Sequence, residues 1–197
     1  GWLRYFSFSV DHKVIGLQYL VCGFVFYLVG GALAGAIRTE LLSPVSDFMP
    51  RDVYNQVLTL HGTVMIFLWI VPVVNGAFGN YLVPIFLGAP EVAFPRVNSF
   101  SFLLLPVSYG FILVSTASEF PGGAGWTLYP PLSTSLMSLS PVAVDLIIDA
   151  LLVAGVSSFF SSLNFFATIG NMRLPGCSLG VLPFFTCGIL ITAVLLL

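Results

Sequence analysis

Long apolar runs separated by short polar segments dominate this sequence. Taking about 20 apolar residues for one membrane crossing, the pattern predicts helices over residues 15–37, 55–86, 99–118, 142–168 and 180–197. The second and fourth runs exceed this minimum, but no polar turn divides them, so each is predicted to be one tilted or protruding helix. The predicted fold is therefore all-α, a polytopic bundle of transmembrane helices in one domain covering residues 1–197.

Proline and glycine mark the connections between these predicted helices, at residues 38–53, 88–98, 119–141 and 171–178. Four other prolines lie inside apolar runs: Pro72, Pro84, Pro106 and Pro183. Neighbouring helices in a membrane can satisfy the carbonyls that lose a donor at such prolines. We therefore expect kinks at these positions and no interruption of the spans.

Composition excludes a soluble globular domain. The chain is 58% hydrophobic and 7% charged, whereas a soluble domain has roughly 25% charged residues. The net charge of −2 and the scattered basic residues give no support for a nucleic-acid partner. The three cysteines show no C-x-x-C spacing and are interpreted as packing residues. No small-residue cleavage site follows the first apolar run. This run is therefore predicted to be a spanning helix and not a signal peptide.

Basic residues predict the orientation of the bundle. Four of them fall on one side of the predicted membrane and two on the other, the first set being Arg4, Lys13, Arg96 and Arg173 and the second Arg38 and Arg51. Because basic loops stay on the cytoplasmic side, the N-terminus is predicted to face the cytoplasm or the mitochondrial matrix.

His61 is the first candidate for chemistry, because it is the single ionisable residue, tyrosines aside, of the apolar run 54–86. It is predicted to lie on the order of 10 Å below the outer end of its helix. The small residues Gly62 and Gly35 would let a planar group approach the helices closely. Arg38 at a similar depth suggests a bound group with an acceptor oxygen, such as a formyl or a carboxylate. The alternatives are a histidine bonded to a neighbouring helix and an arginine that snorkels to the interface.

A second candidate site lies toward the inner side. Asn80, Glu91 and Asn98 cluster around the loop between the second and third predicted helices. The inner half of the fourth helix adds Ser157, Ser158, Ser161, Ser162 and Asn164. Such side chains could order water that leads from an acidic mouth into the bilayer, or the serines could be small packing residues at helix crossings. No phosphate loop, nucleophile elbow or H-E-x-x-H motif supports nucleotide or hydrolytic chemistry.

Four motifs then carry a resemblance that covers essentially the whole chain: L-H-G-T-V-M-I-F, G-A-F-G-N-Y-L-V-P, G-A-P-E-V-A-F-P-R-V-N and G-W-T-L-Y-P-P-L. The sequence resembles subunit I of the haem-copper oxidases, specifically the mitochondrial-type cytochrome c oxidases. The resemblance implies a twelve-helix fold, of which this chain would supply five helices. It also implies an oxidoreductase that reduces oxygen to water with electrons from cytochrome c, coupled to proton pumping.

The resemblance implies a role for several residues. His61 would be one axial ligand of the low-spin haem, a haem A, and Arg38 would hydrogen-bond its formyl group. Trp126 would lie by the haem propionates, with Tyr54 and Gly35 also at the haem. Glu40 would belong to a cation site on the outer face, although one carboxylate supports such a site only weakly. An interfacial belt position is the alternative for Trp126.

For protons, the resemblance implies an input channel that opens at Glu91. It would pass Tyr19, Asn80, Asn98, Ser101, Ser157 and Ser158. This chain departs from the usual pattern, because it carries A-P-E where the family has A-P-D. It also carries Asp149, four positions beyond Asp145, where the family usually has an apolar residue, and we assign Asp149 no role.

Haem a3 and CuB, with their ligands and the second axial ligand of the low-spin haem, are expected on the rest of the subunit, because the family places them on later helices. The last predicted helix ends on Leu197 without an anchoring residue, so more chain or a capping partner is expected there. Expected partners are the remaining part of subunit I, the copper-bearing subunit II, subunit III, cytochrome c and membrane lipids. The expected location is the mitochondrial inner membrane, or alternatively a bacterial plasma membrane. A quinol oxidase, a secondary transporter and a B-type haem remain open alternatives.

Overall fold

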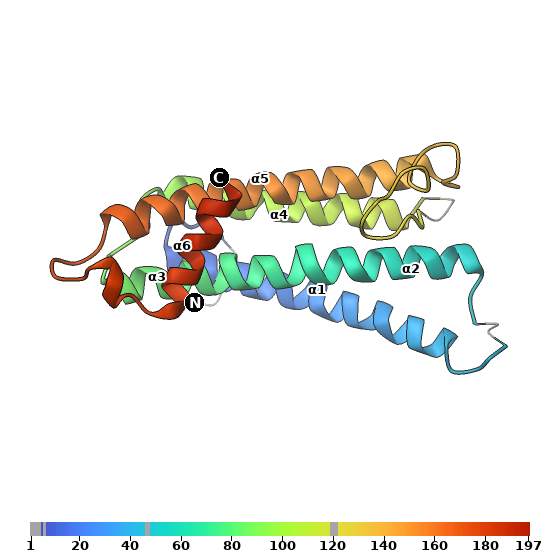
Figure 1. Ribbon diagram of the computed structural model, residues 1–197, viewed down its shortest axis with the longest axis horizontal. Helices are drawn as coiled ribbons and strands as arrows, with labels where there is room; N and C mark the ends of the chain where they lie inside the picture. The colour runs from blue at the N-terminus through green and yellow to red at the C-terminus, as the bar shows by residue number, and fades with distance from the viewer. Residues whose placement is uncertain (1–4, 6, 46–47, 119–121) are drawn as a thin grey trace. The chain divides into compact units, whose positions relative to one another are not determined.

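The structure, a computed structural model, describes residue 5 and the ranges 7–45, 48–118 and 122–197 (Figure 1). The described residues form helices and no strand, which confirms the all-α prediction. In chain order the helices are α1 (His12–Glu40), α2 (Arg51–Thr63), α3 (Asn80–Leu87), α4 (Pro95–Thr116), α5 (Pro141–Asn171) and α6 (Phe184–Leu196). Arg4 and Glu119, which the orientation and loop predictions used, lie outside the described residues.

Four of the described helices are long and apolar enough to cross a membrane: α1, the continuous helix Arg51–Leu87, α4 and α5. The last helix is shorter than the predicted span of residues 180–197, because α6 begins at Phe184 and has 13 residues. Leu179–Val181 forms a separate 3₁₀ turn before it. Pro183 is the N-cap residue of α6, so the kink predicted at this proline is wrong: Pro183 precedes the helix.

The helix Arg51–Leu87 contains two π-helical segments, Val64–Ile70 and Pro72–Gly79, between α2 and α3. Pro72 has no N–H to donate to the preceding turn. The carbonyl oxygen of Leu68, one α-helical turn earlier, instead accepts a hydrogen bond from the Tyr109 hydroxyl at 3.1 Å. The helix therefore continues through Pro72, as expected, but with π-helical turns that the apolar pattern did not predict.

The chain divides into two compact units. Unit 1 comprises residues 70–105 and 154–197 together with the described residues of 1–23. Its apolar core contains Val83 and Leu87 of α3, Phe165 and Ile169 of α5, and Ile189 of α6, with Leu182 and Ala193. Gly79 faces this core, because a Cβ there would lie 2.9 Å from the ring of Phe165.

Unit 2 comprises residues 24–69 and the described residues of 106–153. Two serines of α4 bond to carbonyls of α5: Ser108 to Ala150 at 2.7 Å and Ser115 to Ala143 at 2.9 Å. The rings of Phe26 and Tyr109 stack with centroids 3.8 Å apart, which joins α1 to α4. Small and hydroxyl residues thus let these helices pack closely, as is common in membrane bundles.

Candidate functional site

His61 of α2 makes a hydrogen bond to the backbone of α1. Its Nδ1 lies 2.9 Å from the carbonyl oxygen of Gly30. A carbonyl oxygen only accepts, so Nδ1 must carry the hydrogen, and in the neutral ring the lone pair is then on Nε2. A backbone carbonyl that fixes the tautomer in this way is the usual support of a metal-binding histidine. The ring is half-buried, and Nε2 is the atom available for a metal.

The approach of His61 to α1 depends on Gly30. A Cβ at this position would lie 2.5 Å from Sδ and 2.8 Å from Cγ of Met65. By contrast, a Cβ at Gly31 or Gly35 would have no atom within 4 Å. Gly31, Gly35 and Arg38 are spaced by four and three residues, so they lie on one face of α1, and all three are exposed. This face has room for a flat group.

Arg38 lies in the last turn of α1. In the part of the chain that the structure describes, its guanidinium has no hydrogen-bond or ion-pair partner. The residues therefore fit a haem: a histidine with a free Nε2, an exposed glycine-lined face with open space beside it, and a cation able to bond an oxygen substituent.

Two other predicted haem residues lie near His61 in sequence or in space. Tyr54 precedes His61 by seven residues and shares its face of α2. Trp126, from the α4–α5 loop, packs on Gly62, because a Cβ there would lie 3.2 Å from both Cβ and Cγ of Trp126. The loop is held by a hydrogen bond of 2.8 Å from the Gly125 N–H to the Thr59 hydroxyl. The structure thus brings Trp126 beside the residue that follows His61.

Glu40 ends α1 and is buried, with 6% of its surface exposed. Its Oε2 accepts a hydrogen bond from the Met49 N–H at 2.9 Å, which fixes the α1–α2 loop. Among the described residues, no group of three metal-ligating side chains includes Glu40. Its observed contact is with the loop backbone.

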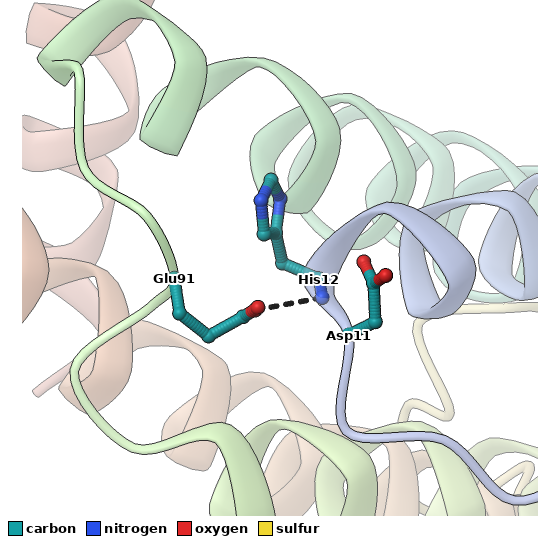
Figure 2. A group of neighbouring side chains, drawn as sticks. All are labelled: Asp11, His12 and Glu91. Atoms are coloured by element: carbon teal, nitrogen blue, oxygen red, sulfur yellow. Dashed lines mark hydrogen bonds between the residues drawn. The ribbon is translucent and has the colours of Figure 1, made fainter.

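In unit 1, Glu91 contacts the start of α1 (Figure 2). Its Oε1 accepts a hydrogen bond from the backbone N–H of His12 at 2.7 Å. The first N–H groups of a helix have no partner inside the helix, and a negative charge there is favourable. The Nδ1 of His12 donates to the carbonyl oxygen of Asn80 at 2.8 Å. Buried His12 therefore connects Glu91 to Asn80.

His12 was not predicted as a site residue. The available signal was its place in D-H-K-V-I-G, next to Asp11 and directly before the first apolar run. Asp11, His12 and Glu91 each offer one metal-ligand atom, and these atoms lie within 4.8 Å of one another. Asp11 also accepts a hydrogen bond from the Lys13 N–H at 2.8 Å. The three side chains form an acidic cluster at the start of α1.

The segment after Glu91 is held by side chains of α5. The Ala93 N–H donates to the Thr168 hydroxyl at 2.9 Å. The Phe94 N–H donates to Oδ1 of Asn164 at 2.9 Å, and Nδ2 of Asn164 donates back to the Phe94 carbonyl at 3.3 Å. These bonds position the loop that carries the acid.

Asn80 and Asn98 are fully buried, with 0% of their surface exposed. Nδ2 of Asn80 donates to the Gly76 carbonyl at 2.7 Å, but its Oδ1 has no partner in the described structure, and neither has either side-chain atom of Asn98. A buried polar group without a partner costs about 1–3 kcal/mol. Ordered water is the usual partner for such groups, so the two amides mark a place where water would be bound.

Farther along, Tyr19, Ser101, Ser157 and Ser161 form what we call the hydroxyl cluster. Ser101 Oγ lies 3.0 Å from the Tyr19 hydroxyl and 2.6 Å from Ser161 Oγ. Ser157 Oγ donates to the Ser101 carbonyl at 2.7 Å. Three predicted proton-path residues are thus in contact, and Ser161 joins them. Ser158 lines a cavity next to the cluster.

Asp145 and Asp149 lie four residues apart on one exposed face of α5. Neither carboxylate has a hydrogen-bond or ion-pair partner within the described ranges. The structure gives Asp149 no contact from which a role could be derived.

Comparison with known proteins places these features in a family. Residues 14–197 match the family model described as Cytochrome C and Quinol oxidase polypeptide I. The chain is 51% identical over 192 residues to cytochrome c oxidase subunit 1 of Plasmodium berghei. The aligned region covers 96% of this chain and 40% of that protein. It is 49% identical over 198 residues to the subunit 1 of Thermostichus vulcanus, covering 100% of this chain and 35% of that protein. The chain thus spans two fifths or less of these relatives, and it belongs to the cytochrome c and quinol oxidase polypeptide I family.

Proposed function

We propose that this chain is part of the catalytic subunit of a cytochrome c oxidase. The complete enzyme would reduce oxygen to water with electrons from cytochrome c and couple this reaction to proton pumping. The names of the relatives at 51% and 49% identity support this proposal. The proposed location is the mitochondrial inner membrane, with a bacterial plasma membrane as the alternative, since the relatives come from both Plasmodium and cyanobacteria.

The observation that carries the proposal is the hydrogen bond between His61 Nδ1 and the Gly30 carbonyl. It leaves Nε2 of His61 free, and this atom would hold the iron of a low-spin haem, proposed to be haem A. When bound, the haem supplies one-electron transfer, with a potential set by its axial ligands and by hydrogen bonds to its substituents. The Gly30 carbonyl holds the imidazole ring in position, and the second protein ligand of this haem would come from the rest of the subunit.

Other residues of unit 2 would orient this haem. The unpaired guanidinium of Arg38 would donate hydrogen bonds to the formyl oxygen. Gly35 leaves room for the ring beside α1, while Tyr54 and Trp126 would lie along its edge, with Trp126 near the propionates. For Glu40 we propose a place in a cation site, to which it would contribute one carboxylate ligand.

The inner face of unit 1 would take up protons. With the N-terminus on the matrix or cytoplasmic side, Glu91 would gather protons and pass them through water held by Asn80 and Asn98. The hydroxyl cluster and Ser158 would continue this path. A carboxylic acid can take up and release a proton, whereas the amides can only orient water. The support is the pair of buried amides with unpartnered atoms.

The remaining parts of the enzyme would come from outside residues 1–197. These are haem a3, CuB, the rest of subunit I, the copper-bearing subunit II and subunit III. Cytochrome c would be the electron donor. Because the matching family also contains quinol oxidases, turnover with reduced cytochrome c should be compared with turnover with a quinol; quinol oxidation alone would contradict the proposed donor.

The His61 assignment is tested by His61→Gly in the complete oxidase, followed by addition of free imidazole. The substitution should abolish the low-spin bis-histidine haem spectrum, and imidazole should restore part of it by occupying the vacated position. Gln56→Gly on the same helix is the matched control and should keep the spectrum. An unchanged low-spin spectrum in the His61→Gly enzyme would refute the assignment.

A further inference from the structure

A small cavity adjoins the hydroxyl cluster in unit 1. It lies where α1, α4, α5, α6 and the π-helical segment Pro72–Gly79 meet. Its volume is about 20 Å³. A water molecule needs about 10–15 Å³ of such space. The cavity is therefore large enough for one water.

Besides members of the hydroxyl cluster and Ser158, three polar side chains line this cavity: Asn75, Ser162 and Thr192. We call them the cavity trio. Within the described residues, none of the three side chains has a hydrogen-bond partner. Ser162 is 4% exposed, and Asn75 and Thr192 are half-buried. Unpaired amide and hydroxyl groups in an apolar surrounding are unfavourable unless something bonds to them.

Apart from these polar residues and Ser158, the walls of the cavity are apolar, and they include Leu105, Phe165 and Ile189. A cavity lined only by such residues would stay empty, whereas a water is stable where two to four polar groups surround it. The cavity trio supplies an amide and two hydroxyls, and Tyr19 and Ser161 reach the same space. The residues that line the cavity thus include enough polar groups for the two to four hydrogen bonds of one water.

We infer that the cavity trio binds a water molecule that extends the hydroxyl cluster, and that this water belongs to the proton path. The inference rests on the proposed function. A hydroxyl and a water each donate and accept hydrogen bonds. A proton from the cluster adds to a lone pair of this water while another proton leaves through a different O–H, so the water is regenerated unchanged.

Asn75 and Thr192 are positioning residues in this scheme, because they orient the water and do not ionise. Thr192 brings α6 into the path, although none of the predicted site residues lies on that helix. Asn75 comes from the π-helical segment, whose next residue, Gly76, contacts the Tyr19 ring. The segment therefore supplies both the amide and the space for the tyrosine of the hydroxyl cluster.

The test uses the complete oxidase carrying Asn75→Leu or Thr192→Val. Thr186→Val is the matched control, because Thr186 lies on α6 with Thr192, is buried and has no hydrogen-bond partner among the described residues, but does not line the cavity. The measurements are water density in a high-resolution structure, the rate of proton uptake from the inner side and its solvent isotope effect. The low-spin haem spectrum verifies that each variant is folded.

Each cavity variant should lower water occupancy and proton uptake about fivefold, the equivalent of losing one hydrogen bond, while Thr186→Val should change neither. Unchanged density in both cavity variants would overturn the water site, and unchanged proton uptake would overturn its role in the path. Glu91→Gln separates the two proposals. If it slows proton uptake while the cavity variants do not, the inference alone fails; if it leaves uptake unchanged, the proposed proton entrance fails and the role of this water fails with it.

Discussion

The carboxylate of Glu91 accepts a hydrogen bond from the backbone N–H of His12 across 2.7 Å, so an acid from the α3–α4 loop caps the first turn of α1. The family motif A-P-D would place aspartate at position 91. In this chain the longer side chain of Glu91 reaches the His12 N–H. The same group thus has a structural role at the helix start and a proposed role in proton uptake.

Two substitutions separate these roles of Glu91. Glu91→Gln keeps an oxygen that can accept from His12 but removes the acid, so proton uptake should slow on the order of 10²-fold with little loss of stability. Glu91→Asp keeps the acid but shortens its reach, so stability should fall by about 1 kcal/mol, as for a lost helix cap. Proton uptake and thermal unfolding of the complete oxidase measure the two effects. Equal changes in both variants would contradict this separation.

Gly30→Ala should disturb the haem through Met65. The new Cβ would lie 2.5 Å from the Met65 sulfur, and overpacking of this kind costs about 1–3 kcal/mol. The carbonyl that supports His61 should then shift, with a change in the low-spin haem absorption band. Met65→Ala in the same chain removes the clash and should restore the band, which a double-mutant cycle can quantify. An additive cycle would show that the two residues do not act together.

Arg38→Met should shift the absorption band and the potential of the low-spin haem, because the substitution removes the guanidinium that is proposed to bond the formyl oxygen. Arg51→Met is the matched control. Arg51 lies exposed in the first turn of α2, where loss of a positive charge is neutral or favourable. If both substitutions shift the spectrum equally, the shift results from the loss of a positive charge at either position and not from a bond between Arg38 and the haem.

Asn164→Leu should loosen the loop that carries Glu91. It removes the acceptor of the Phe94 N–H and the donor to the Phe94 carbonyl, and one such hydrogen bond contributes about 0.5–1.5 kcal/mol. Faster hydrogen exchange at the Phe94 amide is the direct measurement. Asn171→Leu, at the exposed end of the same helix, should leave this exchange unchanged.

The apolar pattern was sufficient for the order and approximate bounds of the helices. For example, residues 142–168 were predicted where α5 spans Pro141–Asn171. It was insufficient at Val64–Gly79, because π-helical turns depend on which carbonyls find partners in space. The donor from Tyr109 to Leu68 joins residues that are 41 positions apart. Periodicity within one helix contains no information on such a bond.

For the candidate sites, residue type and depth singled out His61, but they could not identify the carbonyl of Gly30 as its partner. Glu91 and Asn80 were predicted as neighbours on a path, whereas the connection between them runs through His12. His12 was not among the predicted site residues. Its burial, at 3% exposed surface, results from the packing of distant segments and could not be read from the local sequence.

The π-helical segment Pro72–Gly79 also limits how this gene can vary in length. Removing one residue from it would turn every later side chain of the helix around the helix axis. The Asn80 carbonyl would then leave the ring of His12, and a deletion at or before Gly76 would place Ala77 at the Tyr19 ring. Substitutions at exposed positions such as Val74 and Phe78 leave this register intact. Variation in this segment should therefore consist of amino-acid replacements, with single-codon insertions and deletions removed by selection.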